Sequence, residues 1–173
     1  MPNEIILEKL MNEYGTCILR TCFLYTRDYH LAQDATQETF LKALNAYNNL
    51  KNTESEKAWL TKIAINCCKN IMRTSWYKYV TPDDNILERQ HTMNPINDMI
   101  EHNSLAEAVM LLNRNDRQLI ILYYYQGLSI KEISKITKKK ENTIAQQIRR
   151  ARKKLKQILE DDDNEPSQYE RNP

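Results

Sequence analysis

Apolar residues recur at intervals of three and four along most of this chain, which is the spacing expected for one face of an α-helix. In the first half, the pattern predicts helices over residues 4–26, 31–47 and 55–74, with a polar loop over residues 48–54 before the third. Ser55 is a favoured N-cap type, so we expect it to begin the third helix. The positions expected to face a core are Leu7, Leu10, Met11, Tyr14, Ile18, Cys22, Tyr25, Ala35, Phe40, Ala43, Leu44, Tyr47, Leu60, Ile63, Ala64, Cys67 and Ile71.

The second half carries the same helical spacing in shorter runs, and local signals mark where the helices begin and end. Asn94 and Pro95 predict a helix start, because proline is favoured at the first helical position. A helix over residues 116–126 follows, and Gly127 stands where a helix that ends in a left-handed residue places it. Residues 129–132 read Ser-Ile-Lys-Glu, which is the pattern of a capping box and predicts the start of another helix.

A helix-turn-helix is predicted from the last two helices. The first is short and starts at Ser129, and the second runs from a cap at Asn142 or Thr143 to Leu159, after a turn over residues 137–140. Their expected core positions are Ile130, Ile133, Ile136, Ile144, Ile148, Ala151, Leu155, Ile158 and Leu159.

Composition and charge indicate an all-α protein with two small helical domains. The chain has only 2 Gly and 5 Pro among 173 residues, so few residues interrupt helices. Net charge is +1 over residues 1–76, −3 over 77–104, +9 over 105–159 and −5 over 160–173. The expected parts are a domain over residues 1–76, a flexible linker over 77–94, a domain over 95–159 and a disordered acidic tail over 160–173.

Positive charge is concentrated on the predicted helix-turn-helix. Residues 105–159 contain 13 Lys and Arg against 4 Asp and Glu, although the whole chain carries only +2. Such a concentration is typical of a surface that binds nucleic-acid phosphates. The alternative is that the basic run is an ordinary solvated helix face, but the capping box, the turn and the basic helix would then coincide by chance. A further hypothesis is that the acidic tail competes with DNA for these cations.

The outer face of the predicted third helix carries amides and cations instead of acids. Its members are Lys62, Asn66, Lys69, Asn70 and Arg73. Asparagine is a poor helix former, so two of them four residues apart on one face call for an explanation. Two explanations stay open: ordinary solvent exposure, or hydrogen bonding to an unpaired strand with Trp59, near the helix start, supporting a stacked base.

Other kinds of function lack support. The chain has three histidines and no His-Glu-x-x-His motif, P-loop or nucleophile elbow, so we do not expect an enzyme. A nuclease centre built from Asp83, Asp84 or Glu88 is the alternative to a plain linker. The four cysteines lie inside predicted helices without zinc-site spacing, so we expect reduced, partly buried thiols with neither metal nor cofactor.

We also expect no direct membrane insertion. No apolar run approaches the roughly 18 residues that would span a bilayer. The N-terminal Met-Pro-Asn-Glu is unlike the basic and then apolar start of a signal peptide, so a cytoplasmic protein is expected.

Four motifs resemble those of bacterial sigma factors. Residues 34–43 are similar to the D-x-x-Q-E-x-F-x-x-A signature of their second helix, and residues 59–66 to the W-L-x-x-I-A-x-N run of their third. Residues 127–133 are similar to their G-L-S-x-x-E-I motif, and residues 150–155 to R-A-R-x-x-L. Because the motifs keep their order and only a short linker separates the domains, the chain resembles the extracytoplasmic-function (ECF) group of the sigma-70 family.

The resemblance implies a protein that directs core RNA polymerase to promoters and helps to open them. It implies that Asp34, Gln37, Glu38 and Phe40 dock on the clamp helices of the largest polymerase subunit. An acidic, amide-bearing helix face suits a basic partner. The resemblance also implies a contact with the flap of the second-largest subunit, and an anti-sigma partner, often membrane-bound in this family, that holds the factor inactive.

The resemblance further divides promoter DNA between the two domains. Strand separation at the −10 element exposes base edges, and the residues implied to contact them are Asn52, Trp59, Lys62, Asn66, Lys69, Asn70 and Arg73. Within the helix-turn-helix, residues 129–149 and just beyond, the implied contacts to the −35 element are Lys138, Lys139, Lys140, Asn142, Thr143, Gln146, Gln147, Arg149, Arg150 and Lys153. The residues at the helix start are expected to reach base edges, where glutamine can pair with adenine, and the later Arg and Lys to hold phosphates.

The turn of the helix-turn-helix departs from the family pattern. The family often reads G-V-x-x-G-T-V-K-S-R there, whereas residues 138–147 read K-K-K-E-N-T-I-A-Q-Q. Ala145 and Gln147 therefore replace a lysine and an arginine, and the three lysines of the turn could supply the missing phosphate contacts. The base preference of relatives cannot be transferred to this chain.

One alternative function stays open: a helix-turn-helix repressor or activator that works without polymerase. In that case the first domain would dimerise or sense a ligand, and the protein would bind a palindromic operator by itself. A sigma factor instead needs core polymerase for tight promoter recognition. The two motifs of the first domain favour the sigma factor.

Overall fold

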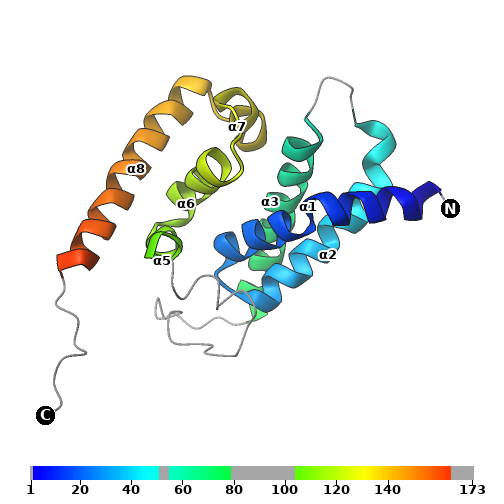
Figure 1. The fold of residues 1–173 in the computed structure, drawn as a ribbon, viewed down its shortest axis with the longest axis horizontal. Coiled ribbons are helices and arrows are strands. Elements are labelled where there is room, and N and C mark those ends of the chain that lie inside the picture. The colour runs from blue at the N-terminus through cyan, green and yellow to red at the C-terminus, as the bar shows by residue number, and fades with distance from the viewer. Residues whose placement is uncertain (1, 51–54, 79–103, 165–173) are drawn as a thin grey trace, which may run out of the picture. The chain divides into compact units, whose positions relative to one another are not determined.

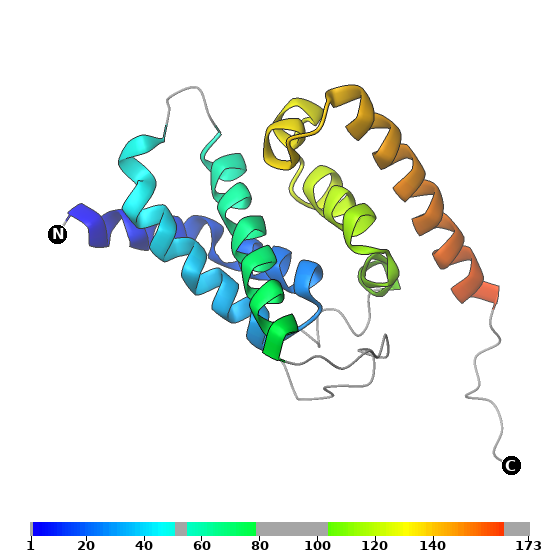
Figure 2. The same ribbon diagram turned by 180° about the vertical axis from the view of Figure 1, so that it is seen from behind.

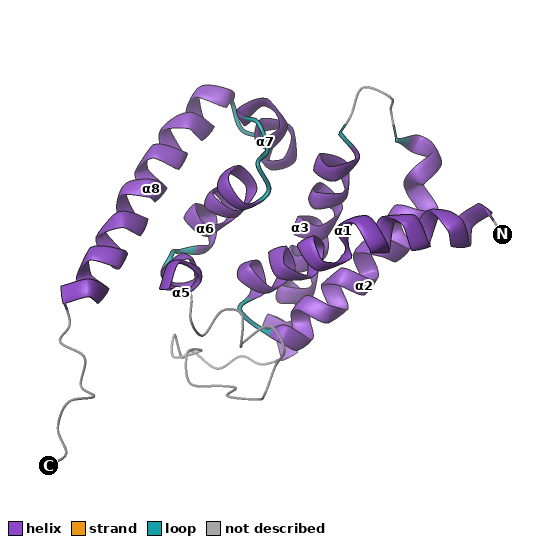
Figure 3. Ribbon diagram, in the orientation of Figure 1, coloured by secondary structure: helices purple, strands orange, loops and turns teal. Residues whose placement is uncertain are grey.

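The computed structural model describes residues 2–50, 55–78 and 104–164. The chain divides into two compact units, unit 1 (Met1–Asp98) and unit 2 (Met99–Pro173). Within the described ranges, both consist of helices joined by loops, and no strand occurs (Figure 3). The prediction of an all-α protein with two helical domains is confirmed.

Unit 1 is a bundle of three long helices, drawn in blue to green in Figures 1 and 2. These are α1 (Pro2–Thr26), α2 (Tyr29–Ala46) and α3 (Glu56–Lys78), and a short 3-10 turn, η1 (Tyr47–Asn49), continues α2. Each of the three helices packs on the other two. The three predicted helices are confirmed, and α3 takes in residues 77–78, which were expected to belong to the linker.

Most predicted core positions of unit 1 are buried or half-buried, and one is exposed. Leu10, Ile18, Cys22 and Tyr25 of α1 are buried, but Met11 is 51% exposed. Met11 lies seven residues, or nearly two full turns, before the buried Ile18, so helical spacing puts both on the same side of α1, and only the packing along the helix separates a covered position from an uncovered one. The prediction that Met11 faces the core was therefore wrong. The buried apolar residues of α2 and α3 are Ala32, Ala35, Phe40, Ala43, Leu60, Ala64, Ile65, Cys67 and Cys68.

The cysteines behave as predicted from their positions in helices. Cys22, Cys67 and Cys68 are buried, Cys17 is half-buried, and none of these four residues forms a disulfide. They contribute to the core as small apolar side chains.

Local polar contacts determine how the helices of unit 1 begin. Arg27 takes the left-handed conformation, with φ of 59°, and reverses the chain after α1. Asp28 then caps α2, because its carboxylate accepts a hydrogen bond from the Leu31 amide at 2.9 Å. Ser55 begins α3 as predicted, and its hydroxyl oxygen accepts from the Ala58 amide at 3.3 Å.

Unit 2 is a set of shorter helices packed along one long helix. Its elements are α5 (Ser104–Leu111), α6 (Arg114–Ile120), a π-helical turn η3 (Ile121–Tyr125), α7 (Ile130–Thr137) and α8 (Glu141–Asn164). The long helix α8 packs against α5, α6 and α7. The buried apolar residues of this unit are Ala108, Val109, Leu112, Leu119, Ile120, Ile121, Leu122, Leu128, Ile133, Ile136, Ile144, Ile148, Ala151 and Leu155.

Two predicted local signals in unit 2 are confirmed. Gly127 takes the left-handed conformation, with φ of 67°, directly after the helical stretch that ends near Gln126. Ser129 and Glu132 form the complete capping box, with the Glu132 amide at 3.2 Å from the serine oxygen and the Ser129 amide at 2.8 Å from the glutamate. The start of the helix-turn-helix is therefore determined locally.

Three predicted helix boundaries in unit 2 were wrong. The helix predicted from residue 116 begins two residues earlier, because α6 starts at Arg114 and Asn113 caps it, with its side-chain oxygen accepting from the Asp116 amide at 3.0 Å. The final helix begins at Glu141, so Asn142 and Thr143 lie inside its first turn instead of capping it. The same helix continues through the acidic residues to Asn164, because residues 160–164 contain neither glycine nor proline and Lys156 pairs with Glu160 one turn away.

Several predictions fall outside the described residues. They concern residues 79–94 of the expected linker, the helix start at Asn94 and Pro95, the acidic candidates Asp83, Asp84 and Glu88, the loop residue Asn52, and the tail over residues 165–173.

Candidate nucleic-acid interface

The outer face of α3 presents one continuous polar stripe. All of its predicted members are exposed: Lys62, Asn66, Lys69, Asn70 and Arg73. They recur at spacings of three and four, so they lie along one side of the helix. Glu56, in the first turn, is the one acidic residue of α3. The stripe therefore combines amide hydrogen-bonding groups with positive charge and no competing carboxylate.

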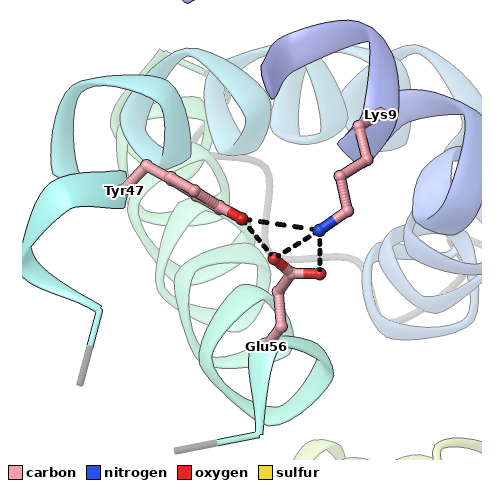
Figure 4. Close-up of polar contacts among 3 residues, drawn as sticks. All are labelled: Lys9, Tyr47 and Glu56. Atoms are coloured by element: carbon pink, nitrogen blue, oxygen red, sulfur yellow. Dashed lines mark hydrogen bonds and ion pairs between the residues drawn. The ribbon is translucent and has the colours of Figure 1, made fainter. Parts of the chain in front are cut away.

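At the start of α3, three polar residues from different elements meet (Figure 4). Tyr47 donates its hydroxyl to the Glu56 carboxylate at 2.7 Å, and Lys9 of α1 lies 3.1 and 3.3 Å from the two oxygens of the same carboxylate. Trp59 is half-buried and packs edge-to-face on Tyr47, with 6.1 Å between ring centroids. This contact cluster fixes the orientation of Trp59 at the point where the polar loop enters α3, and the sequence pattern did not predict it.

The same cluster shifts the pKa of Glu56. Partial burial acts to raise this pKa, but the hydrogen bonds from Tyr47 and Lys9 outweigh it and hold the pKa below the ordinary value of 4.5. Because folding lowers the pKa, the ionised carboxylate stabilises the folded state at pH values above 4.5, and this contribution is lost as the pH falls through the lowered pKa.

We therefore expect Glu56→Gln to reduce the free energy of unfolding slightly at pH 7, and this difference to disappear as the pH falls through the lowered pKa of Glu56 and the carboxylate becomes protonated. Urea unfolding of the wild type and the variant over a pH series measures the difference. A difference that stayed constant over the whole series would show that the charge of Glu56 does not contribute.

The second predicted site lies on α2. Asp34 and Gln37 are exposed, and Glu38 forms an ion pair with Lys42 one turn away. Phe40, predicted as part of this surface, is only 4% exposed and packs in the core beneath it. Leu41, which the pattern did not single out, is instead 59% exposed on the same side of α2, one turn beyond Gln37 and Glu38. The available surface is thus an acidic and amide-bearing face with an apolar residue next to it.

The helix-turn-helix presents the third predicted site. Lys138 ends α7 in the left-handed conformation, and α8 then exposes the following candidates: Asn142, Thr143, Gln146, Arg149, Arg150 and Lys153. A shallow, open hollow of about 500 Å³ on α8 is lined by Gln146, Arg149, Arg150 and Lys153. Gln147 is half-buried and accepts a hydrogen bond from the Lys139 ammonium at 3.1 Å. Amides at the helix start and cations farther along therefore lie on one accessible side.

An aromatic surface in unit 2 was not predicted. Tyr123, Tyr124 and Tyr125 follow one another in η3, and they are 36%, 50% and 38% exposed. The rings of Tyr123 and Tyr124 meet edge-to-face, with centroids 4.9 Å apart. Helical periodicity alone would have placed at least one of the three rings inward, but the π-helical turn changes the register.

Each of the two units matches a known protein family. Sigma-70 region 2 matches residues 10–77, which belong to unit 1, and Sigma-70, region 4 matches residues 102–155, which belong to unit 2. The chain belongs to the sigma-70 family of RNA polymerase sigma factors. Its first three helices are thus those of region 2, and its helix-turn-helix is that of region 4.

Two bacterial sigma factors are similar to this chain over nearly its whole length. SigV of Bacillus subtilis (strain 168), an RNA polymerase sigma factor, is 28% identical over 160 residues, which make up 92% of this chain and 95% of SigV. The ECF RNA polymerase sigma factor SigM of the same strain is 28% identical over 157 residues, or 88% of this chain and 94% of SigM. The fold is similar to that of the sigma factor RpoE from Bartonella quintana, solved in complex with the anti-sigma factor NepR, with a TM-score of 0.74, 21% identity, and coverage of 88% of this chain and 96% of RpoE.

The protein is therefore an ECF sigma factor that directs transcription initiation by RNA polymerase. The sigma-factor family is not enzymatic, in agreement with the sequence-based expectation, and the alternative of a regulator that works without polymerase is set aside. Within the ranges 2–50, 55–78 and 104–164, no helix is both long and apolar enough to cross a membrane. The same ranges contain no cluster of three side chains suited to hold a metal ion.

Proposed function

We propose that this sigma factor docks on core polymerase through α2, contacts the opened −10 element with α3 and reads the −35 element with α8. The observation that carries the proposal is that the three exposed helix faces differ in the chemical type of their side chains. Acidic and amide groups occupy α2, amides and cations occupy α3, and a row of cations follows the amides of α8. Each face suits a different partner surface.

For α3, the proposal is supported by accessible amides and an aromatic side chain on the same helix. Asn66 and Asn70 are exposed on one face, and Trp59 lies at the start of the same helix. Separated strands offer unpaired base edges to such amides and base faces to such a ring. Lys62, Lys69 and Arg73, on the same stripe, would hold the backbone phosphates.

For α8, the order of residue types along the helix supports the proposal. The amide-bearing residues Asn142, Gln146 and Gln147 stand near the helix start, which enters the major groove in a helix-turn-helix. Arg149, Arg150 and Lys153 come later and are exposed, so they suit phosphates on either side of the groove. Of the turn lysines, Lys138 and Lys140 are exposed and suit phosphates as well.

Protein partners form the second part of the proposal. Leu41 among Asp34, Gln37 and Glu38 would meet the basic clamp helices of the largest polymerase subunit, and the exposed tyrosines of η3 would meet the flap of the second-largest subunit. We also propose an anti-sigma factor, held at the membrane, that keeps this factor inactive in the cytoplasm by covering these faces; RpoE of Bartonella quintana was solved in complex with an anti-sigma factor.

Run-off transcription from genomic DNA tests the division of roles. The purified chain with core polymerase is expected to start transcripts at specific sites, and sequencing of these sites should show two separate promoter elements. The chain without core polymerase should select no sites. Random starts in the presence of core polymerase would refute the proposed reading of either element.

On the promoters found in this way, we expect Asn66→Ala and Asn70→Ala to lower discrimination between bases in the −10 element by about 5-fold or more, because a base contact is lost. Arg73→Ala should weaken all promoters evenly, because a phosphate carries no sequence information. Transcription from a promoter library randomised at the −10 element measures both effects. Asn12→Ala, which removes an exposed asparagine of α1, is the matched control and should change neither.

A further inference from the structure

The turn between α7 and α8 presents its lysines in two different ways. Lys138 and Lys140 are exposed, whereas Lys139 is half-buried. The backbone explains the difference, because Lys138 takes the left-handed conformation with φ of 58° and the Ser134 hydroxyl donates a hydrogen bond to the Lys139 carbonyl oxygen. These two constraints fix the path of the turn and leave the Lys139 side chain against α8.

The Lys139 side chain ends on Gln147. Its ammonium nitrogen Nζ lies 3.1 Å from the amide oxygen Oε1 of Gln147, two turns into α8. An ammonium group can only donate, so the atom that faces it must be the amide oxygen and not the nitrogen. The contact therefore fixes which end of the amide points toward the turn. The carbonyl oxygen keeps a second lone pair for another donor, and both N–H groups of Nε2 stay available.

A fixed amide matters for base reading. Glutamine recognises adenine by accepting from the N6 amino group and donating to N7, so both bonds are lost if the amide turns over by 180°. A free glutamine side chain can present either order. A glutamine whose amide oxygen is held in place presents its acceptor and its donor in one order only, so it distinguishes more strongly between base pairs.

We propose that Lys139 is a positioning residue that sets the base preference of Gln147. The inference rests on the proposed function, in which the start of α8 reads the −35 element. Lys138 and Lys140, exposed in the same turn, act on phosphates alone. This chain thus has a lysine–glutamine pair at the positions where the turn and helix start depart from the pattern that the family often shows.

The test compares two lysines of one turn. Lys139→Met and Lys138→Met remove the same charge and keep a side chain of similar length. Holoenzyme assembled from each full-length variant and core polymerase selects promoters from a library randomised across the −35 element. We expect Lys139→Met to lower base discrimination at one position by about 3- to 10-fold, the range that corresponds to one hydrogen bond. Lys138→Met should weaken all sequences evenly.

Gln147→Ala identifies the position concerned. It should lower discrimination at the same base pair as Lys139→Met, by roughly 5-fold or more. In the Gln147→Ala background, Lys139→Met should cause no further change in base preference, because the group that it positions is absent.

The possible failures can be told apart. If Gln147→Ala changes the preference but Lys139→Met acts as evenly as Lys138→Met, the positioning role is refuted and the proposed function stands. If Gln147→Ala changes the preference at no position of the −35 element, its base-reading role fails, and the inference about Lys139 fails with it. A fold defect would lower binding to all sequences and would not produce a change at a single base pair.

Discussion

Leu41→Asp is expected to lower the affinity of the sigma factor for core polymerase by at least about 30-fold, which corresponds to the loss of a hot-spot residue. Leu41 is 59% exposed on α2, within the face that carries Asp34 and Gln37. An exposed apolar side chain loses contact area with the partner when it becomes aspartate, and the new carboxylate must also be desolvated. Titration of labelled sigma factor with core polymerase measures the affinity.

The matched control for this variant is Ile5→Asp. Ile5 is 70% exposed on α1, so the same chemical change is made on another helix of unit 1. Both variants should keep the thermal unfolding behaviour of the wild type, because neither side chain belongs to the core. If the Leu41→Asp variant bound core polymerase as tightly as the wild type does, docking of α2 through Leu41 would be ruled out. If both variants lost affinity equally, the loss would reflect a general defect.

Ile144→Ala is expected to reduce the free energy of unfolding of unit 2 by about 2–5 kcal/mol, because it leaves a cavity in a closely packed core. Ile144 is fully buried in the first turn of α8, the helix that packs on α5, α6 and α7. A small domain has only about 5–15 kcal/mol of total stability, so this loss is large. Promoter binding through the −35 element should fall with it, although no DNA contact is removed. Urea unfolding followed by circular dichroism measures the loss.

Leu111→Ala is the matched control, because it also truncates a large apolar side chain to alanine. Leu111 ends α5 and is 52% exposed, so its truncation should change the unfolding free energy by less than about 0.5 kcal/mol. Similar small effects of both substitutions would mean that Ile144 does not anchor α8 in the core of unit 2.

The candidate site was partly predictable because much of it depends on local order. The stripe of α3 and the cations of α8 follow from helical spacing, so the residues predicted to be exposed there are exposed. On α2, helical spacing placed Phe40 among the core positions, whereas the family resemblance placed it on the docking surface. The packing of α2 on α1 and α3 buries Phe40, so helical spacing was right, and the resemblance did not separate a motif residue that supports the surface from one that forms it.

Helix ends show the same limit. The capping box of Ser129 and the left-handed Gly127 were predicted, because each signal lies within four residues of the feature it produces. The acidic residues after Leu159 were expected to end α8, yet the helix continues to Asn164. Negative charge near a helix C-terminus is only mildly unfavourable, and no residue there is unable to be helical.

The sequence by itself determined the helical character of both units, most helix positions, the concentration of basic charge in unit 2 and, through four motifs, the family. These properties arise from contacts between residues close in the chain or from composition alone. Only the tertiary structure decided that Lys9 meets Glu56 and that Leu41 is exposed on α2. It also decided that Lys139 holds Gln147. Such pairings depend on how helices and turns pack in three dimensions, and the spacing of residue types along one helix carries no information about them.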